Sequence, residues 1–306
     1  MVRPGSEQNQ RGEALQAAEP TIATIGAPPV SVVSEPVLVI QPSRAWFQFD
    51  LASLWQYREL LYFLVWRDLK VRYKQTAIGA AWALLQPLMT MLIFTVIFSQ
   101  FAKIPSDGLP YPIFAYTALL PWTYFAGALS RSSTSVVSEA HLISKVYFPR
   151  AVLPLAGTLS GILDFAVAFV LLAGMMTWYG ITPGWGLLAL PFFLLLALAT
   201  ALAVGLWCSA LNVRYRDVGY VIPFLTQCWM YASPVAYPVS LVPERWRFIY
   251  SLNPMAGVIE GFRWALLGKL GPDFGVMAAS AVVVAVVLVG GLVFFKRMEK
   301  TFVDVV

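Results

Sequence analysis

Long apolar runs separated by short polar segments dominate the chain from about residue 79 onward. A helix that crosses a bilayer needs about 20 mostly apolar residues. Six runs meet this requirement, and they cover roughly residues 79–102, 112–130, 151–178, 185–209, 219–239 and 274–295. The last run carries no charge, whereas Pro121 interrupts the second. The pattern predicts an all-α integral membrane protein with six transmembrane helices.

The part of the chain before these runs divides in two. Residues 1–44 are rich in proline and polar side chains, have no periodic apolar face and lack the order of a signal peptide. We therefore expect a disordered cytoplasmic tail over 1–44, an interfacial helix region over 45–76 and a transmembrane domain over 77–306.

A helical wheel of the interfacial region has two apolar stripes rather than one. One consists of Leu51, Trp55, Tyr62, Trp66, Leu69 and Tyr73, and the other of Tyr57, Leu60, Leu64 and Val71. The gaps between them hold charged residues, among them Arg67, Lys70, Arg72 and Lys74. The pattern predicts a helix that lies at the membrane surface up to about Thr76 and contacts two different surroundings, with a bend at Gly79 before the first span.

The segment between the fifth and sixth spans is too charged to cross a bilayer and too apolar for a solvated loop. Pro243 can begin a first short helix, Asn253 can cap a second with Pro254 in its first position, and Gly268 can end it. Glu260 and Arg263 are three residues apart and can pair on one helix face. We expect two short re-entrant helices on the outer side; an amphipathic hairpin lying flat on the outer surface is the alternative.

Charge sets the orientation and the class of protein. Most of the 21 Lys and Arg residues fall on the side of the two termini, so the positive-inside rule places both termini in the cytoplasm. Of 306 residues, 59% are hydrophobic and 12% are charged, with a mean hydropathy of +0.70. Soluble domains carry about 25% charged residues. Composition therefore agrees with a multi-pass membrane protein.

No catalytic or metal-binding pattern is visible. The sequence has no G-x-x-x-x-G-K-[ST] phosphate loop. Its single histidine, His141, and its two cysteines, Cys208 and Cys228, give neither a metal cluster nor a disulfide framework. We therefore expect a chain that is not itself an enzyme and is powered by another protein.

Asp164 lies within the third predicted span. A charge at this depth is costly and faces protein or water. It could take part in proton coupling, or it could be a structural contact, with Ser160 one turn earlier as a hydrogen-bond partner. No second carboxylate or histidine within the spans completes a proton relay, which favours the structural role.

The cytoplasmic loop 138–154 mixes exposed charges with apolar side chains. Such a patch is typical of a docking surface for another protein, although a turn packed on its own membrane surface is the alternative. The set comprises Glu139, His141, Leu142, Ile143, Lys145, Val146, Tyr147, Phe148 and Arg150.

Three segments carry a resemblance to a known family: LISKVYFPRAVLPL, NVRYRDVGYVIP and SPVAYPVSLVPERWRFIYSLNPMAGVIEGFRWALLG. They resemble the permease subunits of type-2 ABC exporters of polysaccharide or polyol phosphate, which serve O-antigen (lipopolysaccharide), teichoic acid and capsule. The resemblance covers about residues 50–303. It implies export of a lipid-linked polysaccharide, O-antigen first, outward across a bacterial inner membrane. The long proline-rich tail departs from the family.

The same resemblance implies partners and cofactors. The permease is expected to be a homodimer joined to two cytoplasmic ATPase subunits, which bind ATP and Mg, so this chain needs no cofactor and no nucleic acid. Teichoic acid, capsule, drug or lipid export is an alternative, and a polytopic transferase acting on a lipid-linked sugar is a second one.

The family's functional regions transfer onto matching positions. The coupling contact with the ATPase falls on Glu139, His141, Leu142, Lys145, Tyr147, Phe148 and Arg150, and Arg214 and Arg216 are either a second contact or a topological anchor. Part of the dock is expected on Trp66, Arg67, Lys70, Arg72 and Lys74. An outer gate is expected at Trp246, Asn253, Pro254, Glu260 and Arg263. Because sugar rings stack on aromatic rings, a channel is expected along Phe94, Phe98, Trp122, Tyr124, Trp229 and Tyr231, with plain packing as the alternative for each.

Overall fold

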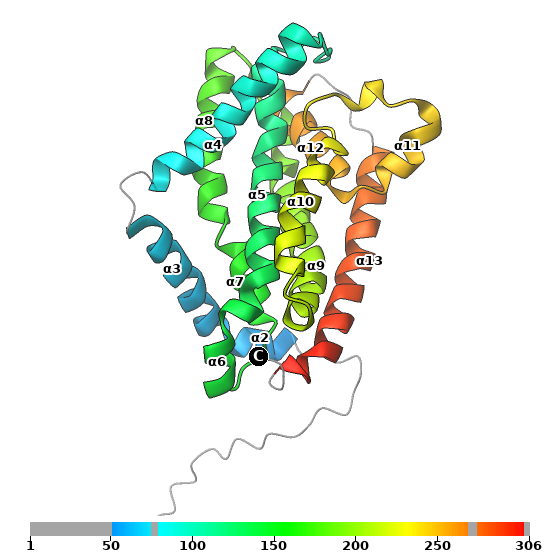
Figure 1. Cartoon of the computed structure of the whole chain (residues 1–306). Coiled ribbons are helices and arrows are strands. Elements are labelled where there is room, and N and C mark those ends of the chain that lie inside the picture. The colour runs from blue at the N-terminus through cyan, green and yellow to red at the C-terminus, as the bar shows by residue number, and fades with distance from the viewer. Residues whose placement is uncertain (1–50, 75–78, 269–273, 303–306) are drawn as a thin grey trace, which may run out of the picture. The chain divides into compact units, whose positions relative to one another are not determined.

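The computed structural model describes residues 51–74, 79–268 and 274–302. Within these ranges every regular element is a helix (Figure 1), which confirms the predicted all-α class. The expected tail over 1–44 and the start of the interfacial region lie outside the described residues.

The helices follow the apolar runs closely in order but not in every boundary. They are α2 (Leu51–Gln56), α3 (Arg58–Lys74), α4 (Gly79–Phe94) with its π-helical continuation (Thr95–Phe101), α5 (Tyr111–Ser138), α6 (Ala140–Lys145), α7 (Val152–Leu159), α8 (Ile162–Trp178), a 3₁₀ turn (Trp185–Ala189) leading into α9 (Leu190–Arg214), α10 (Val218–Tyr231), a 3₁₀ turn (Val239–Leu241), α11 (Glu244–Ser251), α12 (Pro254–Leu267) and α13 (Phe274–Glu299).

Among the described residues, four helical segments are long and apolar enough to cross a membrane: Ala81–Phe101, Val152–Trp178, Trp185–Arg214 and Phe274–Glu299. The two other predicted spans correspond to α5, which is 28 residues long, and to α10, which has 14 residues. At 1.5 Å per residue α10 reaches about 21 Å, less than the roughly 30 Å of a hydrocarbon core. The predicted run 219–239 stops being helical after Tyr231 because Pro234 and Pro238 follow.

The helix α5 lies at the centre of the helical body and packs most extensively against α9, which in turn packs against α13. The α5–α9 crossing requires a glycine, since a Cβ on Gly205 would lie 2.2 Å from the Oγ of Ser132. The large buried side chains of the main core cluster include Phe114, Tyr116, Phe125 and Phe262.

The two predicted stripes of the interfacial region meet different surroundings. Leu60 and Leu64 on α3 pack into a second core cluster together with residues of α5, α6, α7, α9 and α13. Trp55 of the other stripe is 71% exposed, and Tyr62 stacks on Trp66 outside the core. Val71 of the same stripe as Leu64 is 62% exposed, so only part of this stripe meets the core. The expectation of two surroundings stays a prediction. α4 begins at Gly79, as predicted; the expected helix end near Thr76 lies outside the described residues.

The two ends of the helical body carry different elements. The helices α2 and α6 and the end of α13 lie at one end, and α11 and α12 lie at the opposite end (Figure 1). The loop expected to dock a partner and the segment expected to form an outer gate are therefore separated by the length of the long helices.

Candidate functional site

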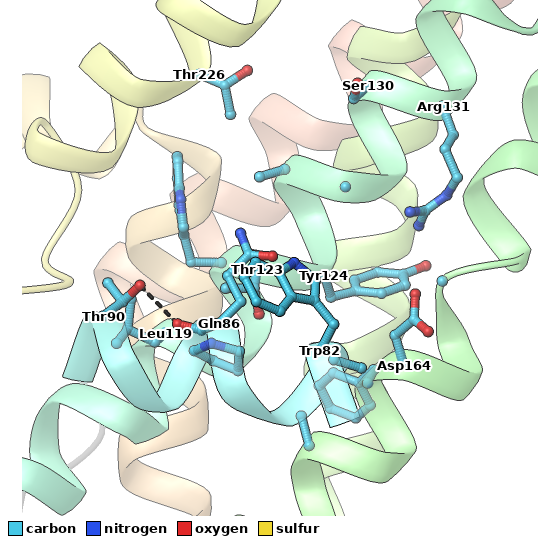
Figure 2. A pocket seen from close by; sticks show the side chains of 18 of the residues that line it. Trp82, Gln86, Thr90, Leu119, Thr123, Tyr124, Ser130, Arg131, Asp164 and Thr226 are labelled. Atoms are coloured by element: carbon cyan, nitrogen blue, oxygen red, sulfur yellow. Dashed lines mark hydrogen bonds between the residues drawn. The ribbon is translucent and has the colours of Figure 1, made fainter. Parts of the chain in front are cut away.

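A cavity of about 1010 Å³ opens between α4, α5, α8 and α10 (Figure 2). On α5 its lining runs from Leu119 to Arg131, which is about 18 Å along the helix axis at about 1.5 Å per residue. α4 contributes positions between Trp82 and Thr90, and α10 contributes positions between Ile222 and Met230. The cavity is therefore an elongated groove that follows the long helices.

The wall of the groove mixes amides and hydroxyls with aromatic rings. The structure records no hydrogen bond for the side chains of Gln86 or Gln227 within the described ranges, and both line the groove. The hydroxyls of Thr90 and Thr226 donate to carbonyls of their own helices, at 3.0 and 2.7 Å. These hydroxyls keep lone pairs for a ligand, so the wall offers donors and acceptors along its length.

Aromatic side chains form one part of the wall. Trp122 and Tyr124 line the groove with most of their surface buried. The ring of Trp122 lies edge-on to Trp229 at 6.5 Å, and Phe125 lies edge-on to the same ring at 5.0 Å. Trp229 of α10 therefore packs against two aromatic rings of α5 at this part of the wall.

Charged side chains gather at one end of the groove. Figure 2 shows Arg131 of α5 and Asp164 of α8 pointing toward one another beside Tyr124. The Nε of Arg131 donates to the carbonyl of Gly157 at 3.0 Å. Arg72, at the end of α3, lines the same region and forms an ion pair with Asp164.

Asp164 is a structural anchor for the interfacial helix. Its carboxylate accepts hydrogen bonds from Arg72 and from the phenol of Tyr73. The expected partner Ser160 donates instead to the carbonyl of Gly157 at 3.0 Å. The helix is interrupted between Ser160 and Asp164, since α7 ends at Leu159 and α8 begins at Ile162. This contact supports the structural interpretation of Asp164 over proton coupling.

The Tyr73 phenol stays protonated in this contact. Burial, followed by the hydrogen bond to Asp164, raises the pKa of Tyr73 from 10.0 to about 12. A raised pKa in the folded protein means that the contact contributes stability below pH 10 and is lost as the pH rises past about 12. The anchor is therefore intact throughout the physiological range.

A second ion pair joins the interfacial helix to the start of α6. Arg67 donates to Glu139 through both terminal nitrogens, one of them at 3.1 Å. The hydrogen bond to Glu139 raises the pKa of Arg67, so the guanidinium remains charged. His141 and Lys145 on α6 are exposed, as are Val146 and Tyr147 directly after it.

Two residues of the predicted coupling contact are directed inward. Phe148 is buried in the second core cluster, where the extended chain after α6 turns back toward α7. The backbone N–H of Arg150 donates to the Glu299 carboxylate at 3.0 Å, and its guanidinium donates to the Glu299 carbonyl. Neither offers its side chain as an open docking surface, in contrast with Arg214 and Arg216, which are exposed.

The segment α11–α12 is held by the contacts that the sequence predicts. Asn253 accepts from the backbone N–H of Met255 at 3.1 Å, Pro254 is the first residue of α12, and Gly268 ends it with φ 63°. Arg263 pairs with Glu260 at 3.1 Å and donates to the carbonyl of Val235 at 3.0 Å. α11 begins at Glu244, one residue after Pro243, and Trp246 on it is exposed.

Comparison with known proteins identifies the family. The profile of the ABC-2 type transporter family matches residues 59–267, which include the interfacial helix, the groove and the α11–α12 segment. The chain belongs to the ABC-2 type transporter family. In this family the permease lacks the ATPase domain, so the chain is the membrane-embedded part of a transporter that has further subunits.

Three relatives show how far the similarity extends. The permease is 29% identical to the O-antigen export system permease protein RfbA of Myxococcus xanthus over 252 residues, 81% of this chain and 96% of that protein. It is 27% identical to RfbA of Klebsiella pneumoniae over 253 residues, 81% of this chain and 95% of that protein. It is 22% identical to the polysialic acid transport protein KpsM of Escherichia coli over 242 residues, 76% of this chain and 91% of that protein.

The structure sorts the aromatic residues expected along a channel. Trp122 and Tyr124 line the groove of the permease, and Trp229 lies directly behind it. Phe94 and Phe98 pack edge-on against each other at 5.1 Å beside the core. Tyr231 is exposed and does not line the groove. Their roles in transport stay predictions.

Sequence reasoning missed several groove residues, and Arg131 is the charged one on α5. Its position between two apolar runs is typical of a loop residue that sets topology, whereas α5 continues as a helix past it to Ser138. The available signal is Gly127, one turn before it, since a small residue at this spacing leaves room for a long side chain against the helix.

Proposed function

We propose that the permease moves a lipid-linked polysaccharide of the O-antigen class outward across a bacterial inner membrane. The observation that carries the proposal is the match to O-antigen export permeases along 95–96% of their length. A match of that extent includes the membrane helices and the α11–α12 segment together, rather than one shared motif. The similarity to KpsM makes capsule polysaccharide the second candidate substrate.

The chemistry of the groove supports a glycan more than an apolar substrate. A hydrated sugar chain needs hydrogen-bonding groups along its path and presents C–H faces that stack on aromatic rings. The groove supplies both, through Gln86 of α4, Thr226 and Gln227 of α10, and Trp122 and Tyr124 of α5.

The proposed topology has six spans, with α5 and α10 added to the four apolar helices and with both termini in the cytoplasm. α5 has the length for a span, and its polar face borders the groove rather than lipid. In this topology α6 faces the cytoplasm, and α11 and α12 enter from the outer side and return as a gate. Support for the gate comes from its tight attachment through Asn253 and Arg263.

The proposed assembly is a homodimer with two cytoplasmic ATPase subunits that bind ATP and Mg. α10 buries only Ile222 and Thr226 and exposes a broad apolar face, with Tyr220 84% exposed. A second copy that covers this face would close the open side of the groove. The wall along the short α10 would then be formed by both chains. The ATPase would bind the exposed side chains of α6 and of the residues directly after it, at His141, Lys145 and Tyr147.

Reconstitution tests the function directly. The permease and its partner ABC ATPase are placed in proteoliposomes with the lipid-linked glycan of the same cell, and a lectin reports glycan on the far side. We expect glycan to appear only with ATP, and not with an ATPase whose phosphate-loop lysine is replaced. Transport of a capsule glycan or of a lipid-soluble drug, without transport of this glycan, would contradict the proposal.

A further inference from the structure

At the end of the groove, the two arginines differ in their direct partners. Arg72, Arg131 and Asp164 all line it, and Arg72 forms its ion pair with Asp164. Arg131 has a single hydrogen bond, from Nε to the Gly157 carbonyl. Within the described part of the chain, its two terminal nitrogens have no hydrogen-bond acceptor and no carboxylate within ion-pairing distance. Arg131 therefore keeps two unused N–H groups, with Asp164 and Asp68 acting on it only from beyond ion-pairing distance.

The guanidinium of Arg131 is held in place by two helix backbones. A Cβ on Gly161 of the α7–α8 junction would lie 2.2 Å from Nη2, and a Cβ on Gly127 would lie 3.1 Å from Nη1. The guanidinium thus lies against both glycines, where an added Cβ would displace it, and its Nε contact orients the plane. A guanidinium fixed in this way presents a fork of N–H donors that matches two oxygens of a phosphate.

The position of the site fits the head of an amphiphile. Arg131 precedes the end of α5 at Ser138 by seven residues, which is about 10 Å along the helix. In the proposed topology this is the depth at which the headgroups of the cytoplasmic leaflet meet the hydrocarbon. The α4 wall beside the groove has Trp82 and Leu85 exposed, so a chain attached to the phosphate can leave toward lipid.

We propose that Arg131, beside the Arg72–Asp164 pair, is the binding site for the phosphate of an amphiphilic substrate. The Nη1 and Nη2 groups of Arg131 donate to the phosphate oxygens, and the groove that runs from Tyr124 toward Leu119 receives the group on the far side of the phosphate. The inference rests on the proposed function, since it gives a place to the phosphate that joins a lipid carrier to a glycan.

Binding of a sugar-free probe tests the site separately from export. The purified full-length chain in nanodiscs is titrated with polyprenyl diphosphate, with the corresponding neutral polyprenol and with inorganic diphosphate. We expect the amphiphilic diphosphate to bind at least tenfold more tightly than either of the other two. Arg131→Gln should reduce its affinity to that of the alcohol. Arg58→Gln, which removes an exposed charge on α3, should leave the affinity unchanged.

Gly161→Ala is a second test of the site, which applies also if the Arg131→Gln variant does not fold. It keeps the charge but displaces the guanidinium, so it should weaken binding of the diphosphate and not of the alcohol; Gly174→Ala, with open space at its Cβ, is its matched control. Equal affinity for diphosphate and alcohol, or an unaffected Gly161→Ala, overturns the proposal. Inorganic diphosphate that binds as tightly as the amphiphile overturns the assignment to a lipid headgroup. Because the probe has no glycan, these results stand even if the polysaccharide export proposed above is wrong.

Discussion

Two buried or half-buried arginines at opposite ends of the permease differ in how their hydrogen bonds are used. Arg263 on α12 is 1% exposed, pairs with Glu260, donates to the carbonyl of Val235 and lies 3.6 Å from the centre of the Phe114 ring. Arg131 on α5 faces a cavity and has one backbone acceptor. Both carry the same charge at the end of a helix bundle.

The difference separates a structural arginine from one available to a ligand. The Nη1 and Nη2 groups of Arg263 donate to groups of its own chain, although its Nε is buried without a hydrogen-bond partner among the described residues. Loss of this side chain therefore leaves acceptors and a carboxylate unpaired inside the protein. The Nη1 and Nη2 groups of Arg131 have no acceptor within the described residues, so its loss leaves no buried carboxylate unpaired. Burial alone does not decide function; the destination of the donors does.

Arg263→Met should have the largest effect on stability. Removal of one partner from a buried ion pair leaves Glu260 uncompensated and costs about 3–5 kcal/mol. We expect a fall of many degrees in the thermal midpoint of the purified permease, and poor accumulation in membranes. Arg245→Met, an exposed arginine on α11, is the control. Equal thermal midpoints for Arg263→Met and Arg245→Met would contradict the structural role of Arg263.

Asn253→Ala should cause the second-largest loss of stability. Its side chain caps α12, accepts from Trp229 Nε1 at 2.9 Å and donates to Ser233 at 2.9 Å. Loss of a cap and of bridging bonds costs about 2 kcal/mol. Trp229→Phe removes one of these bonds and should cost about 1 kcal/mol. Denaturation in mixed micelles measures both, and a larger loss for Trp229→Phe would show that ring packing, not the bridge, holds α12.

Asp164→Asn should have a smaller effect on stability and should also change ligand binding beside Arg131. It removes the ion pair with Arg72 and should cost about 1–2 kcal/mol, because the pair is only partly buried. It also raises the positive charge of the groove, so polyprenyl diphosphate should bind roughly threefold to tenfold more tightly, which is about 0.7–1.4 kcal/mol. Titration at two salt concentrations measures the gain. Weaker binding would mean that Asp164 itself holds the arginines in position.

Removal of the Arg67–Glu139 ion pair should cause the smallest loss of stability. Its side chains are 37% and 20% exposed, so solvent screens the attraction. A double-mutant cycle with Arg67→Gln and Glu139→Gln should give a coupling energy of about 0.5–1 kcal/mol in the permease alone. ATPase activity of the whole transporter, measured on the same four variants, shows whether the pair also transmits force; a coupling above that range would make it a principal anchor of α3.

Local contacts were predictable, and distant ones were not. The cap at Asn253, the end of α12 at Gly268 and the Glu260–Arg263 pair each involve residues within one turn, so spacing along the chain is enough. The Arg72–Asp164 and Arg67–Glu139 contacts join residues 92 and 72 positions apart. No periodicity encodes such a pair. The same limit explains the error on Ser160, whose one-turn spacing from Asp164 is cancelled by a break at Gly161.

The sequence by itself determined the all-α membrane class, the order of the helices, the capped α11–α12 segment and the family, because apolar run length and local capping act within a single helix. The tertiary structure decided which aromatic rings border the groove, which coupling residues remain exposed, and that Arg131 keeps unused donors. Those properties depend on how α3, α5, α8 and α10 meet, and side chains from distant positions acquire burial and partners only when the helices pack.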